Sequence, residues 1–512
     1  MKKIAPLGLG LALSALLVPF ASAVQAAPDP SVVVTAKGAV RGTVGSGVRS
    51  FQGIPYATAA RFDRPRPAAA WTGVRDATAP GKVCAQPAGY PIGKPSTDED
   101  CLNVNVTAPA GKRGKSPVIV WIHGGSMMYG MGDLYGPDRL ARGGAVVVSM
   151  NYRLGVTSFL THPSLKESGG LALDDQRAAL GWVRRNIGAF GGDAGNVTIM
   201  GQSGGGFGVC GHLASPASAG LFQRAILQSS PCDTPGNASR TRAEADAEAV
   251  DVIKNAGCAK HADVAECLRN VGIEKLLEAY GTDREPRPVS GTPELPLPVD
   301  EALRTGRFNR VPVLIGVNHD EENGMILGQE LATGEPMPAQ EYEREIRKEH
   351  GTRAHAVLKR YPLGASAGRT LAKVKTDSVW SAPTLDTARA LSRWTPTRMY
   401  EFAEQDTPWF KGYPAPSFPA AAQHMAELPY MFDLALFDEL TPRQARLGDR
   451  VIGAWVRFAA TGDPNGGGEN AWPRLRDRGQ RGWHVQSLTS GAWTRADYVK
   501  DHEYRFWNTG RR

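Results

Sequence analysis

Short runs of apolar residues alternate with longer amphipathic stretches along most of this chain. Each run is almost continuously apolar, which is typical of strands buried on both faces of a parallel sheet. Residues 174–190, between two of these runs, have the apolar spacing of an amphipathic helix. Strands that alternate with helices predict an α/β fold with a central, mostly parallel sheet flanked by helices. The runs cover residues 117–123, 145–150, 196–200, 224–229 and 311–317.

The N-terminal part of the chain has a different pattern. Residues 31–56 alternate apolar and polar positions between glycine turns, which predicts a small antiparallel part, and residues 102–106 alternate in the same way. No internal repeat and no convincing linker interrupts the chain, so we expect residues 27–512 to form a single domain. Later elements are also predicted: helices within 240–283, 338–361, 382–393 and 443–461, and a strand over 397–402.

Residues 1–26 have the features of a secretory signal peptide. Two lysines precede an apolar run over Ile4–Phe20, and small residues follow it. A membrane anchor is the alternative, but the run is short for a spanning helix and ends in small residues. We therefore expect cleavage near Ala23 or Ala26, and a secreted mature protein without a transmembrane segment.

The net charge of +8 is mild for 512 residues, and the charged residues are dispersed. No basic stripe is interleaved with aromatic residues, so nucleic acid is not expected as a partner. Six cysteines in an exported chain suggest disulfides. Cys84–Cys101 would close a polar loop and Cys258–Cys267 would join a short helical segment, whereas Cys210 and Cys232 remain as a pair or as buried thiols.

A serine between glycines follows the apolar run at 196–200. Ser203 lies in Gly201-Gln202-Ser203-Gly204-Gly205, where a strand is predicted to end and a helix to begin. This arrangement is typical of a nucleophile elbow, whose tight turn requires small residues two positions before and after the serine. The same spacing recurs around Ser366, but no buried strand precedes it, so we interpret that stretch as a loop.

A serine nucleophile needs a base and an acid that orients the base. In α/β hydrolases both follow the serine in the chain, the acid first. Three carboxylates, Asp320, Glu321 and Glu322, follow the apolar run at 311–317, and the residue pattern alone does not choose among them. His424 lies in a loop after the late strand and is the candidate base, although a lone histidine is often only structural.

Further motifs resemble the type-B carboxylesterase and lipase family, the cholinesterase-like α/β hydrolases, in a bacterial secreted form. They are spread from about residue 31 to 465 and so cover nearly the whole mature chain. The resemblance implies an α/β-hydrolase fold and hydrolysis of a small-molecule ester through an acyl-enzyme. It rests on residues 51–57, 99–104, 151–155, 169–176, 179–183, 186–187 and 190–193.

The resemblance also assigns roles to residues. Ser203 matches the family nucleophile, Glu321 the acid and His424 the base, with Glu427 three residues after the base. Backbone N–H groups of Gly125, Ser126 and Gly204 match the oxyanion donors, and Ser229 matches a serine that supports the acid. The pairs Cys84–Cys101 and Cys258–Cys267 match family disulfides. No metal or organic cofactor is implied, and we expect no zinc-binding cluster.

The chain departs from the family near these residues. Gln202 replaces a common glutamate, Gly204 a common alanine, and Met127 a common phenylalanine. Three family glycines are replaced as well, by Glu322, Ala421 and Met425. None of these changes removes a reacting group.

Two alternatives to an esterase follow from the same pattern. Some family members are non-catalytic binding or adhesion proteins, but these usually lose a triad residue, and all three are present here. Hydrolysis of amides, thioesters or lactones would use the same groups. A choline ester is disfavoured because the loop between Cys84 and Cys101 has no tryptophan and Gln202 is uncharged. The oligomeric state is left open by these patterns.

Overall fold

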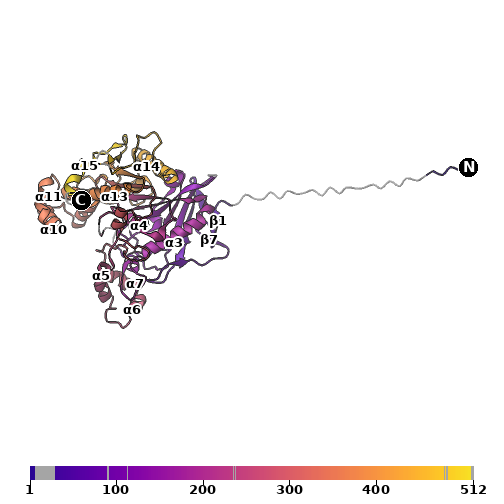
Figure 1. The fold of residues 1–512 in the computed structure, drawn as a ribbon, viewed down its shortest axis with the longest axis horizontal. Helices are drawn as coiled ribbons and strands as arrows, with labels where there is room; N and C mark the ends of the chain where they lie inside the picture. Colours follow the sequence, from indigo (N-terminus) through magenta and orange to yellow (C-terminus); the bar gives the residue numbers. More distant parts are fainter. Residues whose placement is uncertain are drawn as a thin grey trace.

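A large twisted sheet is the frame of the computed structural model (Figure 1). The structure describes residues 1–5, 29–88, 92–111, 114–234, 236, 238–477, 479 and 482–508. Most of the predicted signal peptide lies outside the described residues. In spatial order, the sheet consists of β3 (Thr43–Gly45), β4 (Val48–Pro55), β8 (Asn103–Pro109), β10 (Val146–Met150), β9 (Ser116–Ile122), β11 (Gly192–Gln202), β12 (Arg224–Gln228), β13 (Val313–Asn318), β14 (Thr397–Phe402), β15 (Val485–Leu488) and β16 (Thr494–Arg495).

The middle of this sheet is parallel and its edges are antiparallel. All pairings from β10 through β9 to β15 are parallel, whereas β3, β4, β8 and β16 pair antiparallel. The predicted α/β fold with a mostly parallel central sheet is therefore confirmed. Smaller sheets contain β1 (Val32–Thr35), β2 (Gly38–Arg41) and β7 (Val74–Asp76), and β5 (Ala57–Thr58) and β6 (Arg66–Pro67).

Helices cover both faces of the sheet. Side chains of β9 alternate between two hydrophobic cores, with Val120 in one and Trp121 in the other, so both faces of the strand are buried. This explains why the run is continuously apolar. The first core includes Leu180 of α3 and the second Trp455 of α14. The helices are α1 (Asp138–Arg142), α2 (Gly155–Phe159), α3 (Leu171–Asn186), α4 (Gly204–Ala214), α5 (Arg242–Asn255), α6 (Val264–Asn270), α7 (Ile273–Tyr280), α8 (Val299–Thr305), α9 (Asn323–Thr333), α10 (Ala339–His350), α11 (Ala354–Arg360), α12 (Ala367–Lys375), α13 (Ala382–Ser392), α14 (Pro442–Thr461), α15 (Tyr498–Asp501) and α16 (Tyr504–Trp507).

Two groups of helices extend away from the sheet. In Figure 1, α5, α6 and α7 lie at the bottom of the view and α10 and α11 at its left. None of the described helices is long and apolar enough to cross a membrane.

All six cysteines are paired, as Cys84–Cys101, Cys258–Cys267 and Cys210–Cys232. The sequence left open whether Cys210 and Cys232 pair or stay as buried thiols, and the structure shows that they pair.

Candidate active site

The turn between β11 and α4 holds Ser203 in a strained conformation. Its φ of 54° and ψ of −125° are unusual for a residue with a side chain. The flanking glycines are required by close backbone contacts: a Cβ on Gly201 would lie 2.4 Å from the carbonyl oxygen of Gly205, and one on Gly205 would lie 2.0 Å from that of Ile122. This geometry is that of a nucleophile elbow. Ser366, by contrast, caps the N-terminus of α12, where its Oγ accepts the amide of Arg369.

Two of the residues assigned by resemblance contact each other directly. The Nδ1 atom of His424 lies 2.5 Å from Oε2 of Glu321, and both residues are buried. The other carboxylate oxygen of Glu321 accepts hydrogen bonds from the Ser229 hydroxyl at 2.5 Å and the Asn318 amide at 2.8 Å. The orientation of Glu321 is therefore held from two elements, the end of β13 and the segment after β12.

The second nitrogen of His424 faces a neutral side chain. With its Nδ1 proton donated to Glu321, the imidazole keeps a lone pair on Nε2, which lies 3.0 Å from Nε2 of Gln202. The amide of Gln202 is therefore the donor to this lone pair. Among the described residues, no hydrogen bond joins the hydroxyl of Ser203 to His424. Residue 202, which precedes the serine, thus supplies the group that faces the imidazole in the free protein.

Two more carboxylates lie near this imidazole. Glu427 is buried and accepts hydrogen bonds from Asn318 at 2.6 Å and Gln228 at 3.1 Å, and burial together with Glu321 raises its pKa to about 7. Burial alone would lower the pKa of His424, but the attraction of Glu321, Glu427 and Glu322 outweighs it and raises that pKa. The surroundings of His424 therefore stabilise the imidazolium that forms when it takes a proton.

Glu322 is linked to His424 through a tryptophan. The indole Nε1 of Trp380 donates to Glu322 at 2.6 Å, and the rings of Trp380 and His424 are 4.8 Å apart. Trp380 belongs to a π-helical turn, Thr376–Ser381, between α12 and α13. Such turns are often found at functional sites. Burial raises the pKa of Glu322. The sequence indicated neither this tryptophan nor Gln228, because their neighbours come from distant segments.

The loop after β9 presents backbone amides to the elbow. Ser126 and Met127 both have positive φ, 55° and 58°. A Cβ on Gly204 would lie 2.9 Å from the amide nitrogen of Ser126 and 2.7 Å from that of Met127. Of the predicted oxyanion positions, Ser126 and Gly204 therefore lie side by side, and Gly125 precedes Ser126 in the same loop. The same contacts explain why glycine stands at 204 where the family commonly has alanine.

Two replaced family glycines also occupy left-handed backbone positions. Ala421 has a φ of 51° and Met425 a φ of 76°, on either side of His424. Glycine takes this conformation at little cost, whereas other residues are strained by roughly 1–2 kcal/mol each. The chain around His424 is therefore strained where the family uses glycine.

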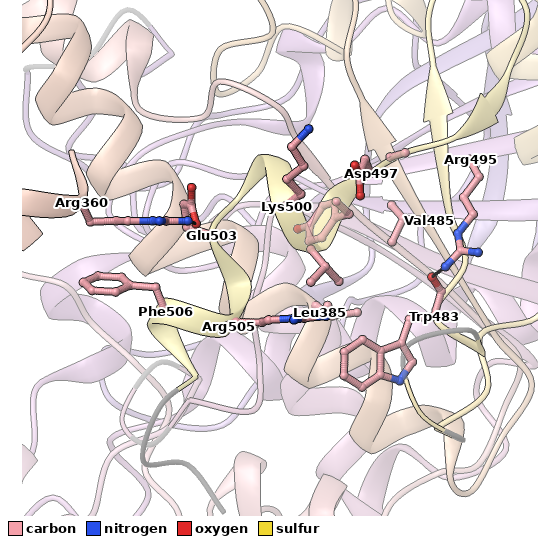
Figure 2. A pocket seen from close by; sticks show the side chains of 13 residues that line it. Arg360, Leu385, Trp483, Val485, Arg495, Asp497, Lys500, Glu503, Arg505 and Phe506 are labelled. Atoms are coloured by element: carbon pink, nitrogen blue, oxygen red, sulfur yellow. Dashed lines mark hydrogen bonds and ion pairs between the residues drawn. The ribbon is translucent and has the colours of Figure 1, made fainter. Parts of the chain in front are cut away.

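A surface pocket of about 560 Å³ lies elsewhere on the molecule (Figure 2). Its walls come from α11, α13, α15, α16, β15 and β16, with charged side chains such as Arg360, Asp497 and Lys500. None of its lining residues belongs to the group around Ser203 and His424. Its position and charge distinguish it from the candidate active site.

Comparisons with known proteins agree with this geometry. A model of the carboxylesterase family matches residues 29–507. Over 87% of its length the chain is 33% identical to the para-nitrobenzyl esterase of Bacillus subtilis (strain 168), covering 93% of that protein. It is 30% identical to human cocaine esterase, over 90% of this chain and 87% of the human protein.

Solved structures give the same result. A PNB esterase superposes with a TM-score of 0.76 at 31% identity, over 93% of this chain and all of that one. A thermophilic PNB esterase gives a TM-score of 0.77, also at 31% identity, over 93% of this chain and 99% of that one. The fold, the elbow and these relatives lead to one conclusion: the chain belongs to the carboxylesterase family and is a carboxylic ester hydrolase.

Proposed function

We propose that the protein is a secreted serine esterase that uses Ser203, His424 and Glu321 as a catalytic triad. The observation that carries the proposal is the 2.5 Å contact between Glu321 and His424 beside a strained, glycine-flanked serine. A base oriented by a carboxylate next to such a serine is the arrangement needed for nucleophilic catalysis. The proposal includes a single domain over residues 27–512.

The reaction follows from the positions of the protons. Nε2 of His424 takes the hydroxyl proton of Ser203 as Oγ forms a bond to the ester carbonyl carbon. The imidazolium then gives this proton to the departing alkoxide as the ester C–O bond breaks, leaving an acyl-serine. Water repeats both steps and releases the acid. Before the first transfer, the Gln202 amide must leave the lone pair that it contacts in the free protein.

Amide donors stabilise the negative charge that develops on the carbonyl oxygen. We assign this role to the N–H groups of Gly125, Ser126 and Gly204, which lie next to the elbow. Because they belong to the backbone and α4 begins at Gly204, they are already oriented before substrate binds. In other serine hydrolases each such donor contributes about 3 kcal/mol to the transition state.

A neutral carboxylic ester is the proposed substrate class. The relatives named para-nitrobenzyl esterase and cocaine esterase support an ester as the substrate. Gln202 places an amide, not a carboxylate, next to the serine. Export is supported by the signal-like residues 1–26 and three disulfides. The binding-protein alternative is not favoured, because no triad position has lost its reactive group.

Hydrolysis of para-nitrophenyl esters of increasing acyl length tests the proposal. We expect a burst of para-nitrophenol equal to the enzyme concentration, followed by a slower steady rate, because an acyl-enzyme accumulates. The burst should vanish in Ser203→Ala and persist in Ser366→Ala, the matched glycine-flanked serine. Full activity in Ser203→Ala would contradict the assignment of the nucleophile.

A further inference from the structure

A second buried cluster of histidines and carboxylates lies beside the triad acid. His319 follows β13, Glu401 belongs to β14, and His502 lies between α15 and α16. One ligand atom from each lies within 4.8 Å of the other two. Within the described ranges, this is the one group of at least three such residues with that spacing. No zinc-binding motif was expected from the sequence, because the three residues come from separate elements.

His502 is oriented as metal-bound histidines commonly are. Its Nδ1 lies 2.7 Å from Asp377, and its Nε2 lies 2.5 Å from Glu401. Asp377 is held in turn by Lys373 at 2.7 Å and the hydroxyl of Tyr361 at 2.8 Å. A carboxylate on one imidazole nitrogen fixes the other nitrogen as a metal ligand and increases its basicity.

The third residue lies nearer the surface than the other two. His502 is fully buried, whereas the His319 side chain is 28% exposed. Nδ1 of His319 lies 3.1 Å from Asp320, which also accepts the amide of Gln405 at 3.0 Å. The cluster is therefore closest to the surface at His319.

We propose that His319, Glu401 and His502 form a binding site for a divalent transition-metal ion of the zinc type. Two imidazoles and a carboxylate are ligands that zinc prefers over the oxygen-rich sets of calcium and magnesium. In a tetrahedral zinc site the ligand atoms lie roughly 3.3 Å apart. Nε2 of His502 and the Glu401 carboxylate oxygen are 2.5 Å apart, so they would move apart by under 1 Å when the ion replaces the proton between them.

The ion would hold the C-terminal segment against the sheet. His502 lies in the segment of α15 and α16 that forms one wall of the pocket in Figure 2, while Glu401 and His319 belong to the strand ends near Glu321. No ligand of this site is a residue of the proposed triad. Its effect is therefore expected on stability and on the C-terminal segment more than on the chemical step.

Titration of the chelator-treated mature protein with Zn²⁺ and Co²⁺ tests this proposal. We expect one ion per chain with a Kd below about 1 μM, and the visible absorption of tetrahedral Co²⁺. Binding should release protons, because the ligands must be deprotonated, and calorimetry in buffers of different ionisation enthalpy measures this release. A rise in melting temperature with Zn²⁺ should accompany binding.

Substitutions distinguish this site from weak surface binding. Affinity should fall at least a hundredfold in His502→Gln and His319→Gln, and about 10- to 100-fold in Asp377→Asn. His355→Gln, an exposed histidine on α11, should bind as the unaltered protein does. His319→Gln keeps the test valid if His502→Gln fails to fold. No binding below 100 μM, or equal binding in His319→Gln, would overturn the proposal.

Discussion

Two buried histidines, His424 and His502, each lie within 2.7 Å of a carboxylate, but they differ at the second ring nitrogen. For His424 that nitrogen faces the neutral amide of Gln202, whereas for His502 it faces Glu401. Because a carboxylate lies on each nitrogen of His502, neither nitrogen is free to take a proton from a serine hydroxyl. A buried histidine–carboxylate pair is therefore a candidate base only when its other nitrogen is available.

Substituting each histidine should separate activity from stability. His424→Ala should reduce kcat on the order of 10⁵-fold, because proton transfer from Ser203 is lost. In chelator-treated protein, His502→Gln should lower the free energy of unfolding by about 3 kcal/mol or more, since buried carboxylates lose their partner, and kcat of the folded fraction should fall by less than tenfold. Para-nitrophenyl ester kinetics and urea denaturation measure the two effects. Equal losses of activity in His424→Ala and His502→Gln would contradict the different roles given to the two histidines.

The carboxylates of Glu321 and Asp377 should also differ in their effects on activity and stability. Glu321→Gln should lower kcat by about 10³- to 10⁴-fold, because an amide does not stabilise the imidazolium and can hold the wrong tautomer. Asp377→Asn should lower the melting temperature with a much smaller effect on kcat, because His502 takes no part in proton transfer. Steady-state kinetics and thermal denaturation of both variants provide the test. A kcat loss in Asp377→Asn as large as in Glu321→Gln would contradict it.

The proposed oxyanion donors beside the elbow should be sensitive to one methyl group. Gly204→Ala restores the residue common in the family, but its Cβ would press on the amides of Ser126 and Met127. We expect kcat to fall about 10²-fold with little change in KM, since these donors act in the transition state. Gly211→Ala, also on α4, is the matched control for helix stability. Unchanged kcat in Gly204→Ala would show that the loop adapts.

The pH dependence should follow the groups around His424. Its raised pKa means that the base becomes protonated, and activity is lost, as pH falls through a value above 6.5. Glu322→Gln removes one carboxylate that raises this pKa, so the acid limb of kcat/KM should move to lower pH by up to about one unit. Gln202→Glu should move it to higher pH. Shifts in the same direction would contradict the electrostatic account.

The smallest effect is expected from relieving backbone strain. Ala421→Gly places glycine at a φ of 51°, which removes strain but increases the entropy of the unfolded chain. We expect a gain in the free energy of unfolding of at most about 1 kcal/mol. Ala420→Gly, the neighbouring position that does not have a positive φ, should instead be destabilising, as urea denaturation can show. A lower free energy of unfolding in both variants would contradict the inference that the backbone at Ala421 is strained.

Much of the fold followed from local patterns. Apolar runs predicted the central strands because each must be buried on both faces, and the predicted strand over 397–402 coincides with β14. The assignments of Glu321 and His424 needed family motifs, because three adjacent acids have the same local pattern. The approach of Gln202 to His424, the link through Trp380 and the His502 cluster depend on contacts between distant segments. The strain at Ala421 and Met425 depends on backbone angles, which composition does not reveal.

The most direct test of the central claim is labelling with a fluorophosphonate followed by mass spectrometry of the adduct. We predict one adduct, on Ser203, that forms in the unaltered protein and in His502→Gln but is lost in Ser203→Ala and greatly slowed in His424→Ala. Such a result would identify His424 as the base that activates this serine. An adduct on Ser366, or labelling of Ser203 at the same rate without His424, would contradict the account.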